Sequence, residues 1–321
     1  MEVILTDRSN SNDQAFFKLS RLNYFYIIEL SYMDKKAQYL STAHSINCNG
    51  RFINTSSPLV MGILNITPDS FFDGGKYNDH KFVLKRINGM LEEGADIIDI
   101  GAYSSRPGAL DITEKEEQER LFSVLELIRN QFPEIILSVD TFRSGIAKGV
   151  VETFQVDIIN DISAGEMDDK MFSTIAKLNV PYVMMHMKGT PQNMQQNVRY
   201  KNDVVFEVID YLAEKKKRLD LLGVHDVIID PGFGFGKSLD HNYELLNRLY
   251  EFRLLGLPIL VGISRKSMIY KLLNSSPQEA LNGTTALHML ALEKGANILR
   301  VHDVKEAKEC IGLYEKLKSL H

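Results

Sequence analysis

Residues 134–163 read EIILSVDTFRSGIAKGVVETFQVDIINDIS, and this stretch contains two short apolar runs separated by a helical pattern. The first run ends at Asp140, and the second ends at Asn160 and Asp161. Residues 143–151 between them are predicted to form a helix. A strand, a helix and a second strand in this order predict two parallel strands that are joined by a crossover helix.

The same alternation recurs along the whole chain. Eight apolar runs end at or beside a polar residue, and they span residues 59–64, 97–101, 135–139, 156–159, 182–185, 227–229, 259–263 and 298–301. Helical patterns follow them at residues 81–93, 114–131, 143–151, 168–177, 203–222, 240–252, 277–294 and 304–320. After a hairpin-like lead at residues 38–53, the eight units predict an α/β fold, the (β/α)8 TIM barrel. An open doubly wound sheet is the alternative, but its dinucleotide-binding glycine pattern is missing.

The composition narrows the functional classes. The chain has 321 residues, of which 44% are hydrophobic and 25% are charged, as in ordinary soluble proteins. A formal net charge of −5 gives no general attraction to nucleic acid or to an anionic membrane. No apolar segment approaches the ~20 residues that a membrane span needs. Cys48 and Cys310 lie in no metal-binding or redox spacing and indicate a reducing compartment, so we expect a cytoplasmic protein.

The first 32 residues differ from the rest of the chain. Residues 7–13 are polar, and the apolar residues 22–32 are interrupted by polar ones. The segment lacks the basic start and the small-residue cleavage site of a secretory signal. We therefore expect residues 1–32 to be a peripheral N-terminal extension and residues 33–321 to form the barrel domain. Our hypothesis is that the extension lies upstream of the natural start.

Asp140, Asn160 and Asp230 stand at the ends of three different predicted strands. The carboxyl ends of barrel strands meet at one rim, so these side chains can converge there. Two carboxylates and an amide in an apolar barrel mouth can read the N–H and C=O edges of a heterocycle. The alternative is that each residue caps the helix that follows it. We interpret Asp99 and His186 as structural residues, with His186 a packed, hydrogen-bonded core histidine.

Basic residues end the last two predicted strands. Arg300 and His302 are two positions apart, so their side chains leave the same face of the strand. The segment Ser264-Arg265-Lys266-Ser267 adds a basic cluster at the end of the preceding strand. If these side chains face inward, the pattern predicts a phosphate or pyrophosphate clamp at the barrel mouth. The alternative is a pair that faces solvent.

Residues 230–238 read DPGFGFGKS and are similar to phosphate-binding loops. A Walker A loop needs glycine where Pro231 stands, and a dinucleotide-binding loop needs a different glycine spacing. We interpret the glycines as allowing the backbone to approach a flat ligand, with Phe233 and Phe235 as a wall beside it.

Together these segments resemble the dihydropteroate synthase family. The resemblance runs from about Ser45 to His302 and rests on MGILNITPDSF (61–71), SSRPGA (104–109), SVDT (138–141), IINDIS (158–163), MHMKGTPQNMQ (185–195), DPGFGFGK (230–237), GISRKSMI (262–269) and LRVHDV (299–304). It implies a transferase of folate biosynthesis that condenses 6-hydroxymethyl-7,8-dihydropterin diphosphate with 4-aminobenzoate, giving 7,8-dihydropteroate and pyrophosphate. It also implies Mg²⁺ as cofactor and a homodimer.

The resemblance also assigns roles to residues. The pterin-binding set would be Asp140, Asn160, Asp230 and Lys266, with Met185 or Met187 and Phe235 packed on the ring. The diphosphate set would be Asn65, Ser105, Arg300 and His302, and Asn65 would also bind Mg²⁺. Ser264, Phe71, Pro107 and the Lys266 stem would border the aminobenzoate pocket. Asp140, Lys266, Arg300 and His302 would carry the catalysis.

The sequence departs from the family pattern at two places, and two alternative functions remain open. Ser105 stands where the family commonly has threonine, and Ala102-Tyr103 replace its more usual Gly-Glu pair. The alternatives are a methyltransferase barrel that acts on methyltetrahydrofolate and a non-catalytic pterin-binding paralogue. A methyltransferase has no use for a diphosphate clamp. A paralogue is expected to lose some of Asn65, Lys266, Arg300 and His302, and all four are present.

Overall fold

The computed structural model describes residues 44–66, 76–104, 111–195, 198–201 and 203–320. Eight strands coincide with the eight apolar runs: β3 (Leu59–Asn65), β4 (Ile97–Gly101), β5 (Leu137–Asp140), β6 (Ile158–Asp161), β7 (Tyr182–Met185), β8 (Val227–Asp230), β9 (Leu260–Val261) and β10 (Ile298–Val301). They form one parallel sheet in the order β8-β7-β6-β5-β4-β3-β10-β9. A parallel bridge from Ile229 to Ile259 joins β8 to the segment before β9. The predicted barrel is confirmed, and the open sheet is excluded.

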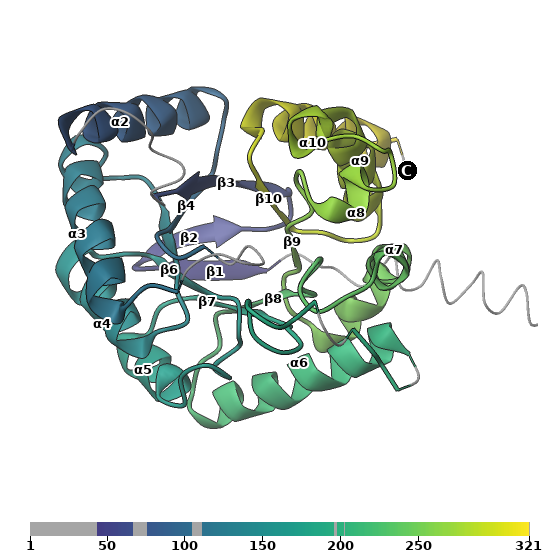
Figure 1. Ribbon diagram of the computed structural model, residues 1–321, viewed down its shortest axis with the longest axis horizontal. Helices are drawn as coiled ribbons and strands as arrows, with labels where there is room; N and C mark the ends of the chain where they lie inside the picture. The colour runs from purple at the N-terminus through teal and green to yellow at the C-terminus, as the bar shows by residue number, and fades with distance from the viewer. Residues whose placement is uncertain (1–43, 67–75, 105–110, 196–197, 202, 321) are drawn as a thin grey trace, which may run out of the picture. The chain divides into compact units, whose positions relative to one another are not determined.

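The helices surround the strands, and Figure 1 shows them as an outer ring that runs from α2 around to α10. They are α2 (Lys76–Glu92), α3 (Glu114–Gln131), α4 (Ser144–Phe154), α5 (Met171–Leu178), α6 (Val204–Leu221), α7 (Leu239–Asn247), α8 (Ser267–Tyr270), α9 (Leu281–Glu293) and α10 (Val304–Lys318). The described part of the chain also contains two 3₁₀ segments, η2 (Leu249–Leu255) and η3 (Pro277–Glu279). No helix in the described ranges is long and apolar enough to cross a membrane.

Most predicted helices are confirmed, with differences at their ends. Helix α3 matches its prediction because Thr113 and Glu116 form a reciprocal capping box at its start. The predicted helix at 240–252 is instead divided into α7 and η2, because the backbone at Arg248 leaves the helical region (φ −109°, ψ 22°). The predicted helix at 277–294 begins with η3 before α9 continues. Helix α8 was not predicted, since four residues are too short for a periodic pattern.

The interior of the barrel follows from the two-residue period of its strands. One set of strand residues faces the helices and forms the largest apolar core, which includes Val60, Ile98 and Val139. The alternate set faces inward. Near the amino ends of the strands it is apolar and includes Met61 and Ile158. Towards the carboxyl ends it becomes polar, and this is where the site lies.

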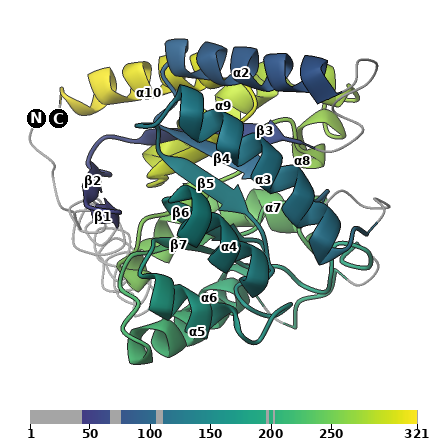
Figure 2. The same ribbon diagram turned by 90° about the vertical axis from the view of Figure 1, so that its left-hand side faces the viewer.

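The hairpin predicted at residues 38–53 is confirmed over its described part and lies at the amino end of the barrel (Figure 2), whereas residues 38–43 lie outside the described residues. It consists of β1 (Ser45–Cys48) and β2 (Arg51–Asn54), paired antiparallel. Asn49 and Gly50 turn the chain with φ values of 54° and 86°, as expected for Asn-Gly in a tight hairpin. Ile46 packs with the inward apolar side chains, so the hairpin closes this end of the barrel.

Candidate active site

An inward-facing cluster links four strands of the barrel: β4, β5, β6 and β10. Asp99 on β4 is completely buried and accepts hydrogen bonds from Ser138 Oγ (2.6 Å), Asn160 Nδ2 (3.2 Å) and Arg300 Nε (2.7 Å). Arg300 Nη2 also donates to Asp140 Oδ2 at 2.9 Å. Arg300 therefore faces inward, and the alternative of a solvent-facing side chain is excluded.

The cluster refines the interpretation of Asp99. The Asp99 carboxylate is fully buried, as expected of a structural residue. It also forms hydrogen bonds with two predicted site residues, Asn160 and Arg300. Because Asn160 donates through Nδ2 to Asp99, its Oδ1 remains as the acceptor for a ligand. Arg300 Nη1 makes no hydrogen bond within the described ranges, so this nitrogen remains as a donor.

The protonation equilibrium of the Asp140 carboxyl group is strongly shifted. Burial raises the pKa of Asp140 to about 7, although the Arg300 guanidinium opposes the shift. The nearby carboxylates of Asp99, Glu117 and Asp161 add to the rise in pKa because like charges disfavour ionisation. Asp140 therefore changes charge near neutral pH, which is unusual for an aspartate and typical of functional sites.

Asp230 and Lys266 form the second half of the site. A Cβ atom built on Gly262 would lie 3.9 Å from both Asp230 Oδ2 and Lys266 Nζ, so the two groups converge over this glycine. Asp230 Oδ1 accepts a hydrogen bond from the Gly232 amide at 2.7 Å. Burial lowers the pKa of Lys266 to about 8, and burial raises the pKa of Asp230, each partner opposing the other's shift.

None of the three strand-end residues caps a helix. The N-caps of the following helices α4, α5 and α7 are Arg143, Lys170 and Ser238. The capping alternative for Asp140, Asn160 and Asp230 is therefore excluded. Asp161 does form a local turn, since its carboxylate accepts from the amides of Ser163 and Gly165.

Apolar side chains cover one side of the barrel mouth. Met185 and Met187 belong to a buried cluster against which Phe235 packs, as the resemblance implies. Phe233 is completely buried in the outer core between strands and helices. The prediction that Phe233 forms a wall of the ligand site is wrong, because alternate residues of the loop point in opposite directions.

Tyr103, one of the departures from the family pattern, also lies in this mouth cluster. Its ring packs edge-on against Phe142 with centroids 5.0 Å apart. Its hydroxyl accepts a hydrogen bond from Gln192 Nε2 at 2.8 Å. Tyr103 therefore connects the end of β4 to the loop that follows β7.

His302 and Ser264 lie together at the rim. Ser264 Oγ and His302 Nδ1 are 3.2 Å apart, and Ser264 Oγ also accepts from the His302 amide. Arg265 is oriented differently from Lys266, because its guanidinium pairs with Asp303 through Nε at 2.9 Å. Of the predicted basic cluster, Lys266 alone reaches Asp230.

Asn65 ends β3 beside the same mouth. Its Oδ1 would lie 3.6 Å from a Cβ atom on Gly101, and Asp140 Cβ would lie 3.5 Å from that point. The side-chain amide of Asn65 has no hydrogen-bond partner among the residues that the structure describes. Its Oδ1 is therefore available to a cation or a ligand. Phe71, Ser105 and Pro107 lie outside the described residues.

Sequence reasoning overlooked Lys237, which is buried beside the site and donates to His186 Nδ1 at 2.9 Å. The available signal was a lysine that closes a glycine-rich loop directly after a strand, set aside because the loop is not a phosphate-binding one. His186 is a buried, hydrogen-bonded histidine, as predicted.

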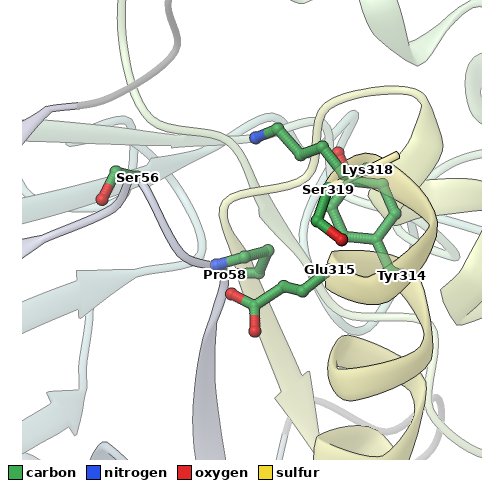
Figure 3. Close-up of a pocket in the computed structure, with 6 residues that line it drawn as sticks. All are labelled: Ser56, Pro58, Tyr314, Glu315, Lys318 and Ser319. Carbon is green, nitrogen blue, oxygen red and sulfur yellow. The ribbon is translucent and has the colours of Figure 1, made fainter. Parts of the chain in front are cut away.

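A separate cavity lies at the opposite end of the barrel (Figure 3). It has a volume of about 230 Å³ and is lined by Ser56, Pro58, Tyr314, Glu315, Lys318 and Ser319. These residues precede β3 or end α10, so the cavity is at the amino end of the strands and takes no part in the site described above.

Comparison with known proteins agrees with this geometry. The profile of the family described as "pterin binding enzyme" matches residues 61–302. Dihydropteroate synthase of Escherichia coli K12 is 44% identical over 268 residues, which cover 83% of this chain and 94% of the relative. The Haemophilus influenzae enzyme is 40% identical over 269 residues, 83% of this chain and 96% of the relative.

Solved structures give the same result. Yersinia pestis dihydropteroate synthase, in a sulfonamide complex, has a TM-score of 0.80 at 40% identity, covering 86% of this chain and 100% of that one. The Xanthomonas albilineans enzyme in complex with 7,8-dihydropteroate has a TM-score of 0.77 at 34% identity, covering 86% and 99%. The chain therefore belongs to the dihydropteroate synthase family of pterin-binding enzymes.

Proposed function

We propose that this chain catalyses the condensation of 6-hydroxymethyl-7,8-dihydropterin diphosphate with 4-aminobenzoate to give 7,8-dihydropteroate and pyrophosphate. The observation that carries the proposal is the inward cluster at the carboxyl ends of the strands. It places the Asp140 and Asp230 carboxylates near the Arg300 and Lys266 cations, with the Asn160 amide oxygen available beside them.

The pterin is bound by the polar groups of mid-barrel. Ionised Asp140 and Asp230 accept N–H groups of the heterocycle, and Asn160 Oδ1 accepts another. Lys266 Nζ donates to a ring acceptor, and the ring packs against Met185 and Phe235. This set of acceptors selects a ligand whose edge is rich in N–H donors.

The leaving diphosphate is held at the rim. When the C–O bond at the pterin methylene breaks, the electron pair goes to the diphosphate, and negative charge grows there. Arg300 Nη1 and His302 stabilise this charge, and ionised Asp140 favours the positive charge left on the methylene carbon. The roles of Ser105 in the diphosphate site and of Phe71 and Pro107 in the aminobenzoate pocket remain predictions.

The amine of 4-aminobenzoate is a neutral nucleophile that needs positioning rather than activation. Ser264 and the aliphatic stem of Lys266 border its pocket in our proposal. The nitrogen attacks the methylene carbon and then loses one proton. The apolar mouth cluster around Met185 excludes water, which would otherwise compete as the nucleophile.

Asn65 is the proposed protein ligand of Mg²⁺. The described part of the chain contains no group of three or more His, Cys, Asp or Glu side chains that could hold a metal ion. Mg²⁺ commonly binds one or two protein oxygens together with substrate phosphates and water. The unpartnered Asn65 oxygen fits that mode, and bound Mg²⁺ would neutralise charge on the diphosphate.

The direct test supplies the pterin diphosphate, Mg²⁺ and labelled 4-aminobenzoate and looks for labelled dihydropteroate. A matched reaction with methyltetrahydrofolate as methyl donor tests the methyltransferase alternative. Product in neither reaction, with pterin binding retained, would favour a non-catalytic paralogue. The molar mass from light scattering after size-exclusion chromatography tests the predicted homodimer. Cell fractionation tests the predicted cytoplasmic location.

A further inference from the structure

The loop after β8 is held by side chains rather than by a regular backbone ladder. Each of the five successive carbonyl oxygens of residues 232–236 accepts a hydrogen bond from a side chain. The donors, in order, are Lys237 Nζ to Gly232 (2.8 Å), Lys266 Nζ to Phe233, Gln195 Nε2 to Gly234 (2.8 Å), Lys237 Nζ to Phe235 (3.1 Å) and Tyr200 Oη to Gly236 (3.1 Å). Lys237 therefore supplies two of the five contacts.

Lys237 also binds the end of β7. Its Nζ lies 2.9 Å from His186 Nδ1 and 3.3 Å from the His186 carbonyl oxygen. Burial lowers the pKa of His186 well below its usual value, so the ring is neutral and Nδ1 can accept. With the two loop carbonyls, four acceptors surround a side chain that is only 3% exposed. No carboxylate is among its hydrogen-bond partners within the described ranges.

This arrangement is costly to bury and specific in geometry. An amine that is removed from water needs a hydrogen-bond partner for each of its N–H groups. If one loop carbonyl were misplaced, an N–H group of Lys237 and that carbonyl oxygen would both be buried without a partner. Gly232 has φ +73°, and a Cβ on it would come within 1.9 Å of the His186 oxygen. The loop can therefore approach β7 closely only with glycine at this position and Lys237 between the two segments.

The same loop fixes two groups of the ligand site. Phe233 O accepts the hydrogen bond of Lys266 Nζ, and that nitrogen lies 4.7 Å from the centroid of the Phe235 ring. Gly234 has φ +83°, a conformation that favours glycine, and a Cβ there would lie in ordinary contact with Lys266 Cδ at 3.4 Å. If the loop shifts, the ring of Phe235 and the amine of Lys266 shift with it.

We propose that Lys237 is a positioning residue for the pterin site: its amine holds the loop of residues 231–236 against β7 and thereby fixes the places of Phe235 and Lys266. Lys237 itself contacts neither substrate. The inference rests on the proposed function, because it assigns Lys237 to the pterin-binding half of that site.

The test compares Lys237→Met with Lys215→Met. Lys215 on α6 is also 3% exposed, but it pairs with Glu166 and makes no hydrogen bond to the β8 loop within the described ranges. For each folded variant we would measure the affinity for 6-hydroxymethylpterin by calorimetry, and kcat and the KM of the pterin diphosphate. We expect Lys237→Met to weaken pterin affinity and raise this KM by about tenfold or more, with kcat changed by less than about threefold.

The control separates positioning from general stability. Lys215→Met should lower the melting temperature and leave pterin affinity and KM near wild type. If Lys237→Met does not fold, Lys237→Gln is measured instead, and it should show a smaller rise in KM because its amide keeps one donor group. Wild-type pterin affinity and KM in the folded variant would overturn the proposal, as would an equal rise in Lys215→Met. Failure of the proposed function is distinct, since then the wild-type enzyme itself makes no dihydropteroate.

Discussion

The perturbed pKa values predict a bell-shaped dependence of kcat/KM on pH, with its maximum between about 7 and about 8. The acid limb belongs to Asp140, whose pKa burial raises to about 7, because the ionised carboxylate is the form that accepts from the pterin. The alkaline limb belongs to Lys266, whose pKa burial lowers to about 8, because only the ammonium carries a positive charge. The profile of kcat/KM reports the ionising groups of the free enzyme and of the free substrate.

The expected magnitude follows from these values. At the maximum about 60% of the enzyme has Asp140 ionised and Lys266 charged, and at pH 5.5 only about 3% of Asp140 is ionised, so kcat/KM for the pterin diphosphate should fall about twentyfold below its maximum. At pH 9.5 about 3% of Lys266 is charged, which gives a similar fall of about twentyfold. The assay is the initial rate of dihydropteroate formation across this range at constant ionic strength.

Two variants assign the limbs. Asp140→Asn should lower kcat/KM at its optimum and flatten the acid limb, and Lys266→Met should do the same to the alkaline limb. The terminal phosphate of the substrate also titrates, at a pKa of about 6 for a phosphate ester. An acid limb that persists unchanged in Asp140→Asn would therefore belong to the substrate or to Asp230, whose pKa is also raised by burial, and would refute the role of Asp140.

Three further predictions concern single side chains. Asp230→Ala should abolish calorimetric binding of 6-hydroxymethylpterin while circular dichroism stays native, because the heterocycle loses one of its two carboxylate acceptors; wild-type affinity would contradict the assignment of Asp230 to the pterin pocket. Arg300→Ala should lower kcat/KM about a hundredfold, since the leaving diphosphate loses one of the donors that stabilise its growing charge; an unchanged kcat/KM would remove Arg300 from the mechanism. Ile46→Ala should cost about 2–5 kcal/mol in urea unfolding because a core side chain is lost, whereas the exposed Phe52→Ala should cost far less.

The strand–helix alternation allowed the barrel to be predicted because both elements follow local physical rules. Runs such as residues 135–139 are too apolar for the surface and too short for a helix. The Thr113 cap is a contact within four residues, so the start of α3 could be read directly. The division of the predicted helix at Arg248 could not be read, since it depends on the conformation of one backbone unit within a continuous pattern.

The candidate site was predictable where strand ends alone decide it. Asp140, Asn160 and Asp230 follow from position, because all parallel strands end at the same rim. The contact of Asp99 with a site residue could not be predicted, because its partner Arg300 is 201 residues away in the chain. The two phenylalanines of the glycine-rich loop look equivalent in sequence, and only the positive φ angles of its glycines send Phe233 into the core and leave Phe235 at the mouth.

The sequence by itself therefore determined the fold class, the family and the convergence of Asp140, Asn160 and Asp230 at the barrel mouth, since these depend on local periodicity and short motifs. The tertiary structure decided how those residues are paired. Arg300 lies between two carboxylates, Asn160 presents its oxygen, and Lys237 links the β8 loop to β7. Such pairings depend on distances across the barrel that no local pattern encodes, and they set the charge and orientation of every group that a substrate would meet.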